Sequence, residues 1–152
     1  MSEDLDKDDL RILSILQNNS KIGYKKLSKT LGMPASTIHD RVKRLIEKKI
    51  IQDYVVLLND EALGYTHTAI IGVETGAQLY KEVASKLSII PEVVEVYGTT
   101  AQYDLMIKIR ANSRAHLSEV IDSLRNIKGV NDINIASVLN VFKETHTLPL
   151  NP

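Results

Sequence analysis

Short polar and long basic side chains are interleaved with apolar ones between residues 34 and 48. At 3.6 residues per turn, Ile38, Val42 and Leu45 fall on one face of a helix. The opposite face and its flanks carry polar and charged residues, namely Ser36, Thr37, His39, Asp40, Arg41, Lys43 and Arg44. Such a helix can pack its apolar face on a small core and enter the major groove of DNA, where short groups reach base edges and basic groups reach phosphates.

We assign the side chains of this polar face to two kinds of DNA contact. The predicted base-edge contacts are Ser36, Thr37, His39 and Asp40. The predicted phosphate contacts are Arg41, Lys43 and Arg44, supported by Lys25, Lys26 and Lys29. Simpler interpretations stay open, because a charged helix face is often merely solvated. Arg41 can form a structural ion pair with the body of the protein, and Asp40 can pair with Arg44 at i+4.

The distribution of charge also favours a nucleic-acid partner. The chain of 152 residues is neutral, with 19 Lys and Arg against 19 Asp and Glu. Residues 20–50 nevertheless hold nine basic and two acidic residues, whereas residues 53–152 hold eight basic and twelve acidic ones. A basic segment on a mildly acidic remainder indicates a nucleic-acid-binding head on a body with another task.

The composition disfavours several other classes of protein. The absence of cysteine excludes disulfides, thiolate metal sites and Cys nucleophiles. The four histidines, at positions 39, 67, 116 and 146, are too scattered for a metal cluster, so we expect neither a metal nor another cofactor. We find no membrane span and no signal peptide, and therefore expect a soluble cytoplasmic protein.

The residues before position 34 predict the elements that hold the basic helix. Asp6 is a suitable N-cap for a helix over residues 6–18, with Leu5 and Leu10 spaced as a hydrophobic staple. A short second helix over residues 24–31 ends at Gly32, where a positive φ is expected, and Pro34 suits the first turn of the third. Two short helices joined by a tight turn, with the basic one second, form a helix-turn-helix.

The remainder of the chain predicts a strand and then an α+β domain. Residues 50–58 are β-branched and apolar and are predicted to be a strand that acts as a wing, a hinge or a pairing edge for a second subunit. Six elements follow in the order βαββαβ: strand Thr66–Glu74, helix Gln78–Ser88, strand Val93–Tyr97, strand Tyr103–Arg110, helix 114–126 capped by Ser113, and strand Val130–Phe142. This order predicts a ferredoxin-like sheet with both helices on one face.

Three segments result from this prediction. Residues 1–52 form a helix-turn-helix DNA-binding domain, residues 53–65 a hinge strand and linker, and residues 66–152 an effector-binding and oligomerisation domain. We expect the uncovered face of the sheet to be apolar and to pack on a second subunit, with Ala69, Ile71, Val73 and Met106 as its apolar members.

This organisation resembles the Lrp/AsnC family of transcription regulators across essentially the whole chain. The first helix matches in Leu5-Asp6-x-x-Asp9-x-x-Ile12-Leu13-x-x-Leu16 and the second in Leu27-Ser28-x-x-Leu31-Gly32. The recognition helix and the residues after it match in Thr37-Ile38-x-x-Arg41-Val42-x-x-Leu45 followed by Ile50-Ile51. The hinge matches in Leu58-Asn59 and Leu63-Gly64-Tyr65, and the effector segment in Tyr97-x-Thr99-Thr100-Ala101-Gln102-Tyr103-Asp104.

The resemblance implies a homo-oligomer, a dimer that often closes into an octamer, with a small effector between neighbouring dimers. Carried over to this chain, the effector-binding residues are Gly98, Thr99, Thr100, Ala101, Gln102, Tyr103 and Asp104, with Ser137 on the last strand. Asp104 can accept the ammonium group of an amino acid, and turn N–H groups with the Thr99 and Thr100 hydroxyls can take its carboxylate. The segment resembles the asparagine-responsive branch of the family more than the leucine-responsive one, which makes Asn or Gln the first candidates. Ala101 replaces the usual Gly and is strained if that position needs a positive φ.

Three functions compete on these grounds. The favoured one is a sequence-specific transcription regulator, not an enzyme, whose assembly or binding to double-stranded DNA responds to an amino acid. The second is an architectural DNA-binding protein that has no effector. The third, less favoured, is an enzyme similar to the sirohaem decarboxylases of related fold, for which His67 and His116 are available without an accompanying basic cluster.

Overall fold

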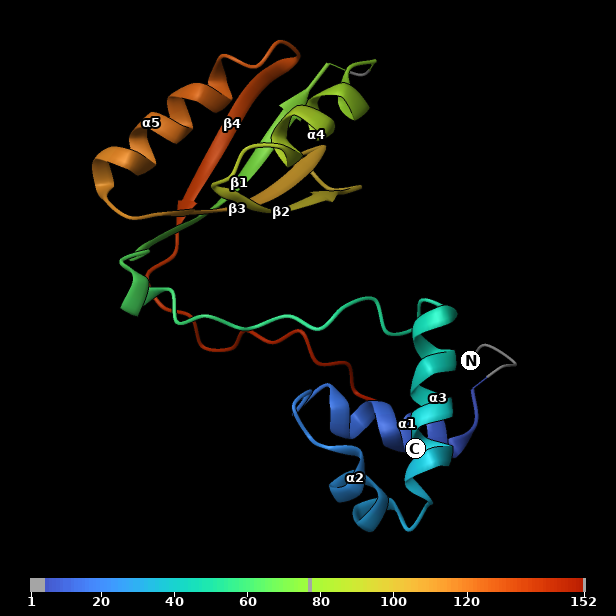
Figure 1. Ribbon diagram of the computed structural model, residues 1–152. Coiled ribbons are helices and arrows are strands. Elements are labelled where there is room, and N and C mark those ends of the chain that lie inside the picture. Colours follow the sequence, from blue (N-terminus) through green and yellow to red (C-terminus); the bar gives the residue numbers. More distant parts are fainter. Residues whose placement is uncertain (1–4, 77, 152) are drawn as a thin grey trace. The chain divides into compact units, whose positions relative to one another are not determined.

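The computed structural model describes residues 5–76 and 78–151, and the order of its elements is that of a helix-turn-helix followed by βαββαβ (Figure 1). Two units are described separately here. The helical unit holds the described residues up to Leu57 together with those from Lys143 onward, and the sheet unit holds Leu58–Phe142.

Three helices make up the helical unit: α1 (Lys7–Leu16), α2 (Tyr24–Leu31) and α3 (Ala35–Glu47). The predicted N-cap is confirmed, because the Asp6 carboxylate accepts the N–H of Asp9 at 2.8 Å, and Asp9 accepts the N–H of Asp6 in return at 3.3 Å. Gly32 ends α2 with a φ of +69°, as predicted. Pro34 is the N-cap of α3 and not a first-turn residue, because its ψ of 141° is extended and not helical.

The core of the helical unit combines one face from each helix. Ile12, Leu16, Leu27, Leu31, Ile38, Val42 and Leu45 are all buried. The predicted apolar face of α3 is therefore confirmed, since its three members belong to this core.

The sheet unit contains four antiparallel strands in the order β2-β3-β1-β4, which confirms the ferredoxin-like prediction. The strands are β1 (His67–Thr75), β2 (Val93–Gly98), β3 (Leu105–Ala111) and β4 (Val130–Ser137). Helix α4 (Tyr80–Ser88) packs on β2, and α5 (Arg114–Arg125), capped by Ser113 as predicted, packs on β3 and β4. A short 3-10 turn, η1 (Glu61–Leu63), precedes β1.

The prediction for the uncovered face of this sheet was wrong for three of its four residues. Ala69, Ile71 and Val73 are fully buried in the core beneath the helices. The opposite parity of β1 and β3, which includes Ile70, Gly72 and Met106, forms the uncovered face, called here the open face. Both parities of β1 contain apolar residues, and packing favours burial of the one with the larger branched side chains.

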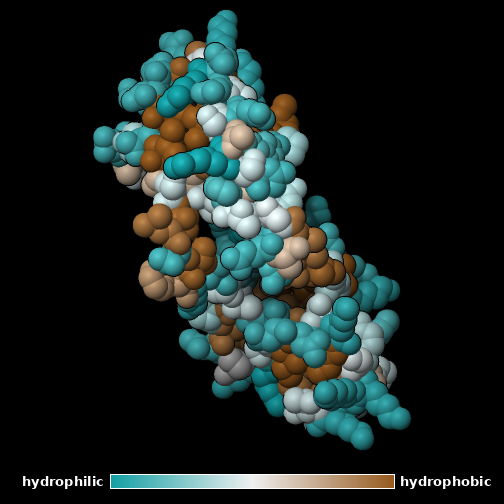
Figure 2. Space-filling view, turned by 90° about the vertical axis from the view of Figure 1, so that its left-hand side faces the viewer, coloured by the Kyte–Doolittle hydropathy of each residue, from teal (hydrophilic) through white to brown (hydrophobic). Residues whose placement is uncertain are grey.

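The prediction of a strand over residues 50–58 was also wrong for this chain. Residues 51–58 follow an irregular path, because a strand needs a neighbour to hydrogen-bond and this segment finds none within the described chain. The segment is highly exposed although its side chains are apolar: Val55, Val56 and Leu57 are 69%, 73% and 74% accessible. Figure 2 shows several patches of hydrophobic side chains, in brown, among the hydrophilic ones on one face of the surface.

The last strand is shorter than predicted. It ends at Ser137 and not at Phe142, because β1, its pairing partner, begins at His67 and offers only the Thr68 carbonyl to the N–H of Val138. Phe142 is consequently 95% exposed.

Candidate functional site

Helix α3 presents a polar face to solvent and an apolar face to the core. Ser36, Thr37, His39, Asp40 and Lys43 are all exposed. They are held in place because Ile38, Val42 and Leu45, on the other side of the same helix, are at most 1% accessible. This arrangement leaves the short polar groups and one lysine free to approach an external ligand.

Arg41 and Arg44 turn away from this polar face toward α1. Arg41 Nη1 donates to Asp9 Oδ1 at 2.8 Å and to Asp6 Oδ2 at 2.7 Å. Arg44 Nη2 donates to Asp9 Oδ2 at 2.5 Å. Asp9 is fully buried, and each of its carboxylate oxygens accepts a hydrogen bond from a guanidinium of α3. These contacts join the recognition helix to α1.

The network changes the acid–base properties of its exposed members. Hydrogen bonding to the Arg41 guanidinium holds the pKa of Asp6 below its ordinary value, and the same bond is the main cause of the raised pKa of Arg41. Both groups therefore stay charged at neutral pH, and the contact between them is an ion pair.

Sequence reasoning missed Asp9 as a partner of these arginines. Arg41 forms the structural ion pair that we gave as an alternative to a phosphate contact. The alternative pairing of Asp40 with Arg44 is wrong, because Arg44 pairs with Asp9. Asp40 lies beside His39, with 3.6 Å between Asp40 Oδ1 and His39 Nδ1. The available signal was an acidic residue at the N3 position of a capping box, opposite two arginines spaced three apart on another helix.

The first turn of α2 adds to the polar surface of α3. The Tyr24 and His39 rings meet edge to face, with centroids 5.5 Å apart and an interplanar angle of 80°. Lys25 and Lys26, which follow Tyr24, are exposed, as is Lys29 one turn later. The predicted phosphate-binding lysines of α2 thus lie on a helix that touches the polar face of α3.

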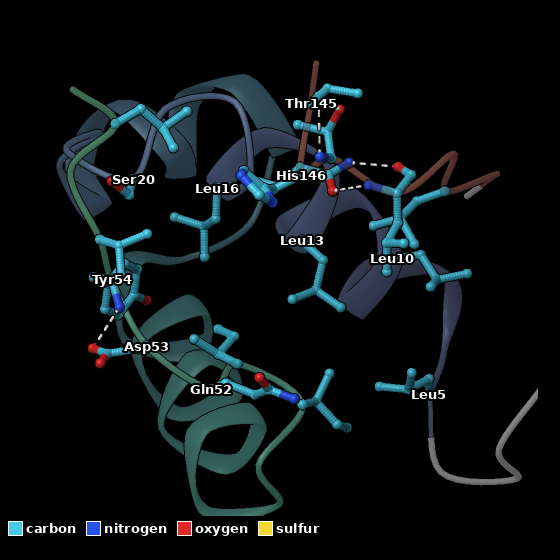
Figure 3. Close-up of a pocket in the computed structure, with 18 residues that line it drawn as sticks. Leu5, Leu10, Leu13, Leu16, Ser20, Gln52, Asp53, Tyr54, Thr145 and His146 are labelled. Carbon is cyan, nitrogen blue, oxygen red and sulfur yellow. Dashed lines mark hydrogen bonds between the residues drawn. The ribbon is translucent and has the colours of Figure 1, made fainter. Parts of the chain in front are cut away.

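The helical unit contains a cavity of about 640 Å³ (Figure 3). It lies between α1, the segment 50–57 that follows α3, and the C-terminal segment 145–150. It is lined mostly by apolar side chains, among them Leu10, Leu13 and Leu16. The Gln17 side chain pairs with the Leu148 backbone through two hydrogen bonds of 2.9 Å. The C-terminal segment therefore packs with the helical unit, although the expected domain boundary groups it with the sheet. The apolar lining of the cavity suits neither phosphates nor a zwitterion.

The β2–β3 turn contains six of the predicted effector-binding residues and follows a seventh, Gly98, which ends β2. The two ends of the turn are tightly bonded. The Thr99 N–H donates to the Asp104 carbonyl at 2.9 Å, and the Thr99 hydroxyl donates to the Tyr103 carbonyl. Asp104 Oδ2 accepts the backbone N–H of Thr75 at 2.7 Å and the Thr75 hydroxyl at 3.1 Å. Asp104, which we predicted to bind an ammonium group, thus also bonds the end of β1.

The tip of the turn is open to solvent. Thr100, Ala101 and Gln102 are exposed, and the Ala101 N–H donates to Thr99 Oγ1 at 3.3 Å. Ala101 is not strained, because Lys49 is the one non-glycine residue with a positive φ in the described parts of the chain. The turn accepts alanine in place of the glycine that the resemblance implies.

Ser137 lies at the other end of the sheet from this turn. Ser137 pairs with Ala69, near the start of β1. The turn ends at Leu105, which pairs with Val73 near the end of β1. A single chain therefore does not bring Ser137 to the remaining predicted effector residues.

The histidines have separate polar partners. His67 Nδ1 lies 3.0 Å from Thr66 Oγ1, and the His116 ring lies 3.1 Å from both Glu92 and Asn112. In the described part of the chain, no three His, Asp or Glu side chains converge as a metal site would require.

Comparison with known proteins assigns both units to domains of one family. Residues 5–46 match the AsnC-type helix-turn-helix domain, and residues 68–148 match the Lrp/AsnC ligand binding domain. The chain belongs to the Lrp/AsnC family. As a family member it is a DNA-binding transcription regulator, which agrees with the exposed polar face of α3.

Relatives match over nearly the full length of the chain. The HTH-type transcriptional regulator FL11 of Pyrococcus furiosus is 43% identical over 96% of this chain and 97% of its own length. The HTH-type transcriptional regulator Ptr1 of Methanocaldococcus jannaschii is 33% identical over 96% of this chain and 99% of its own. Because these relatives are regulators, this Lrp/AsnC protein is a regulator and not an enzyme.

Two solved structures share the fold. The transcriptional regulator NMB0573 of Neisseria meningitidis, in complex with L-Met, has a TM-score of 0.92 at 29% identity and covers 97% of each chain. AsnC of E. coli has a TM-score of 0.88 at 29% identity, covering 94% of this chain and 97% of its own. Among residues 5–76 and 78–151, no helix of this Lrp/AsnC protein is long and apolar enough to cross a membrane.

Proposed function

We propose that the protein recognises a specific DNA sequence through the exposed face of α3. The observation that carries this proposal is the separation of the helix into a buried apolar face and a solvent-facing set of Ser36, Thr37, His39, Asp40 and Lys43. In this proposal the short groups contact base edges, while Lys43, Lys25 and Lys26 contact phosphates.

Arg41 and Arg44 have a different part in this proposal. Their guanidinium groups are held by Asp9, so they mainly position α3 against α1. The Arg44 side chain remains 42% accessible and the Arg41 side chain 22%, and this exposed portion contributes positive charge toward the phosphates.

Substitutions on this face separate the two kinds of contact. With a duplex selected from a random library, Thr37→Ala is expected to relax sequence preference at one base position by about 1–3 kcal/mol, as loss of a base contact does. Lys43→Ala is expected to weaken binding to all sequences and to lower the slope of log affinity against log salt by about 1. Fluorescence anisotropy at several salt concentrations measures both effects.

Lys86→Ala is the matched control, because Lys86 lies on α4 of the sheet unit and pairs with Glu82 at 2.6 Å. It should leave both quantities unchanged. Footprinting that finds uniform protection of any duplex, with no preferred site, would rule out sequence-specific recognition.

We further propose that the β2–β3 turn binds an amino acid. The exposed tip offers backbone N–H groups, the Thr100 hydroxyl and the Gln102 amide, and Asp104 supplies negative charge at its base. The L-Met complex of the N. meningitidis relative supports an amino acid as the class of effector. Ser137 joins the site only if it comes from another subunit.

Titration calorimetry with L-Asn, L-Gln and L-Met tests this part of the proposal, and we expect heat from at least one. An effector must also bind two states of the protein unequally to regulate it, so its addition should change DNA affinity or assembly. No heat from any of the twenty amino acids would favour an architectural protein without an effector.

We propose that the protein works as a homo-oligomer, at least a dimer. The apolar segment Tyr54–Leu58 is exposed, and in the described chain no helix covers the open face of the sheet, although the Tyr103 ring lies over Gly72. Light scattering that finds a monomer at every concentration would contradict this.

A further inference from the structure

Gly72 of β1 makes an unusually close contact with the β2–β3 turn. The Tyr103 ring lies directly over it, so a Cβ added at Gly72 would be 2.4 Å from Cδ2, 2.5 Å from Cγ and 2.8 Å from Cε2 of that ring. Cγ is the atom that attaches the ring, and rotation of the ring about that bond cannot relieve the overlap. The backbone or χ1 of Tyr103 would have to move.

A backbone requirement does not account for this glycine. Gly72 sits in the middle of β1, between Met106 of β3 and Asn134 of β4, and its φ is not positive. Glycine weakens the interior of a strand and often marks a site where another group approaches closely. Here that group is the aromatic ring of a turn residue.

Two further contacts fix the ends of the same turn. Three residues after Gly72, the buried Thr75 holds the Asp104 carboxylate through its N–H and its hydroxyl, at 2.7 and 3.1 Å. At the other end, the Tyr80 hydroxyl of α4 occupies the space that a Cβ on Gly98 would need. One end of the turn is therefore bonded to β1 and the other lies against Tyr80 of α4, whereas its tip, Thr100–Gln102, is exposed.

We propose that Gly72 and Thr75 are positioning residues for the effector turn. Gly72 admits the Tyr103 ring and Thr75 anchors Asp104, so β1 sets the direction in which the tip presents its N–H and hydroxyl groups. A site whose donors are fixed before the ligand arrives loses less freedom on binding and binds more tightly. This inference rests on the proposed effector role of the turn.

Gly72→Ala tests the inference, with Gly76→Ala as the matched control. A Cβ at Gly76 meets only Leu79 Cδ1, at an ordinary 3.8 Å. In the full-length protein, Gly72→Ala should speed deuterium exchange in the peptide that covers Gly98–Asp104, while the peptides of β3 and β4 keep their protection. Its affinity for whichever of L-Asn, L-Gln and L-Met binds the wild type should fall about tenfold or more. Gly76→Ala should match the wild type in both measurements.

A double-mutant cycle distinguishes positioning from general damage to the sheet. Tyr103→Ala removes the ring with which the new methyl group collides. Gly72→Ala should therefore have little further effect on turn exchange in a Tyr103→Ala background. Thr75→Val keeps the N–H donor and removes the hydroxyl, and should give a smaller change of the same kind.

The possible outcomes are separable. If Gly72→Ala leaves turn exchange at the wild-type rate, or if its effect persists in full without the Tyr103 ring, the positioning role is overturned. If the wild type binds no amino acid, the proposed effector function fails, while the exchange measurement still decides whether β1 positions the turn.

Discussion

Replacing Asp9 with asparagine is expected to lower the free energy of unfolding of the helical unit by about 3 kcal/mol. The Asp9 carboxylate is fully buried and accepts hydrogen bonds from both Arg41 and Arg44. Asparagine has nearly the same shape but no charge, and its amide nitrogen points a donor at one guanidinium. In the variant Arg41 keeps its bond to Asp6, at 2.7 Å, but Arg44 loses the carboxylate to which it donates.

The expected loss lies at the lower end of the range of about 3–5 kcal/mol for breaking a buried ion pair. The reason is that the Arg41 and Arg44 side chains are 22% and 42% accessible, so water can solvate part of the released charge. Thermal unfolding followed by circular dichroism measures the change, and hydrogen exchange of α1 and α3 assigns it to the helical unit.

Asp8→Asn is the matched control for this prediction. Asp8 lies in the same first turn of α1, but its side chain is 39% accessible, its bond to Arg11, at 3.1 Å, is exposed, and it approaches Arg41 only to 3.9 Å. Exposed pairs of this kind contribute about 0.2–1 kcal/mol at most. Equal destabilisation by the two substitutions would show that Asp9 acts only as another acid near a helix N-terminus.

The features that the sequence predicted correctly are those that depend on local spacing. The buried face of α3 follows from the period of Ile38, Val42 and Leu45, and the cap at Asp6 and the stop at Gly32 follow from the chemistry of single positions. The order of elements in the sheet unit follows from the same kind of pattern.

The features that the sequence did not reveal depend on which elements become neighbours. Whether Arg41 faces DNA or Asp9 is decided by how α3 lies against α1, and periodicity says nothing about that. Ala69 and Ile70 are both apolar, so only the tertiary packing shows which of the two faces of β1 the helices cover. The contact between Gly72 and Tyr103 joins residues that are far apart in the chain.

The failed strand prediction has the same origin. Residues 50–58 have strong β-propensity, but propensity does not supply a hydrogen-bonding partner. Their exposed apolar side chains fit the alternative in which a second copy provides that partner, which is the assembly proposed above.

Ile38→Ala is expected to destabilise the helical unit by about 2–5 kcal/mol and to abolish specific DNA binding without changing a polar residue of α3. Ile38 is fully buried, and the small core of this unit has few side chains that can move to fill the cavity. Local unfolding of α3 would disperse Thr37 and His39, the two neighbours of Ile38 that we assign to base contacts. Hydrogen exchange of the α3 amides, compared with those of β1, should show the loss confined to the helical unit.

The same helix supplies an equivalent residue in a different environment, which makes the prediction sharp. Ile46 is also an isoleucine of α3, but it is 44% exposed. Ile46→Ala removes the same atoms without leaving a buried cavity, and surface changes of this kind are usually within about 0.5 kcal/mol. DNA affinity and α3 exchange should thus stay at wild-type values in Ile46→Ala and change sharply in Ile38→Ala. If both variants lose DNA binding equally, burial of Ile38 is not what holds the recognition face in place. The loss would then come from removing any isoleucine of α3, or from a direct contact between Ile46 and the DNA.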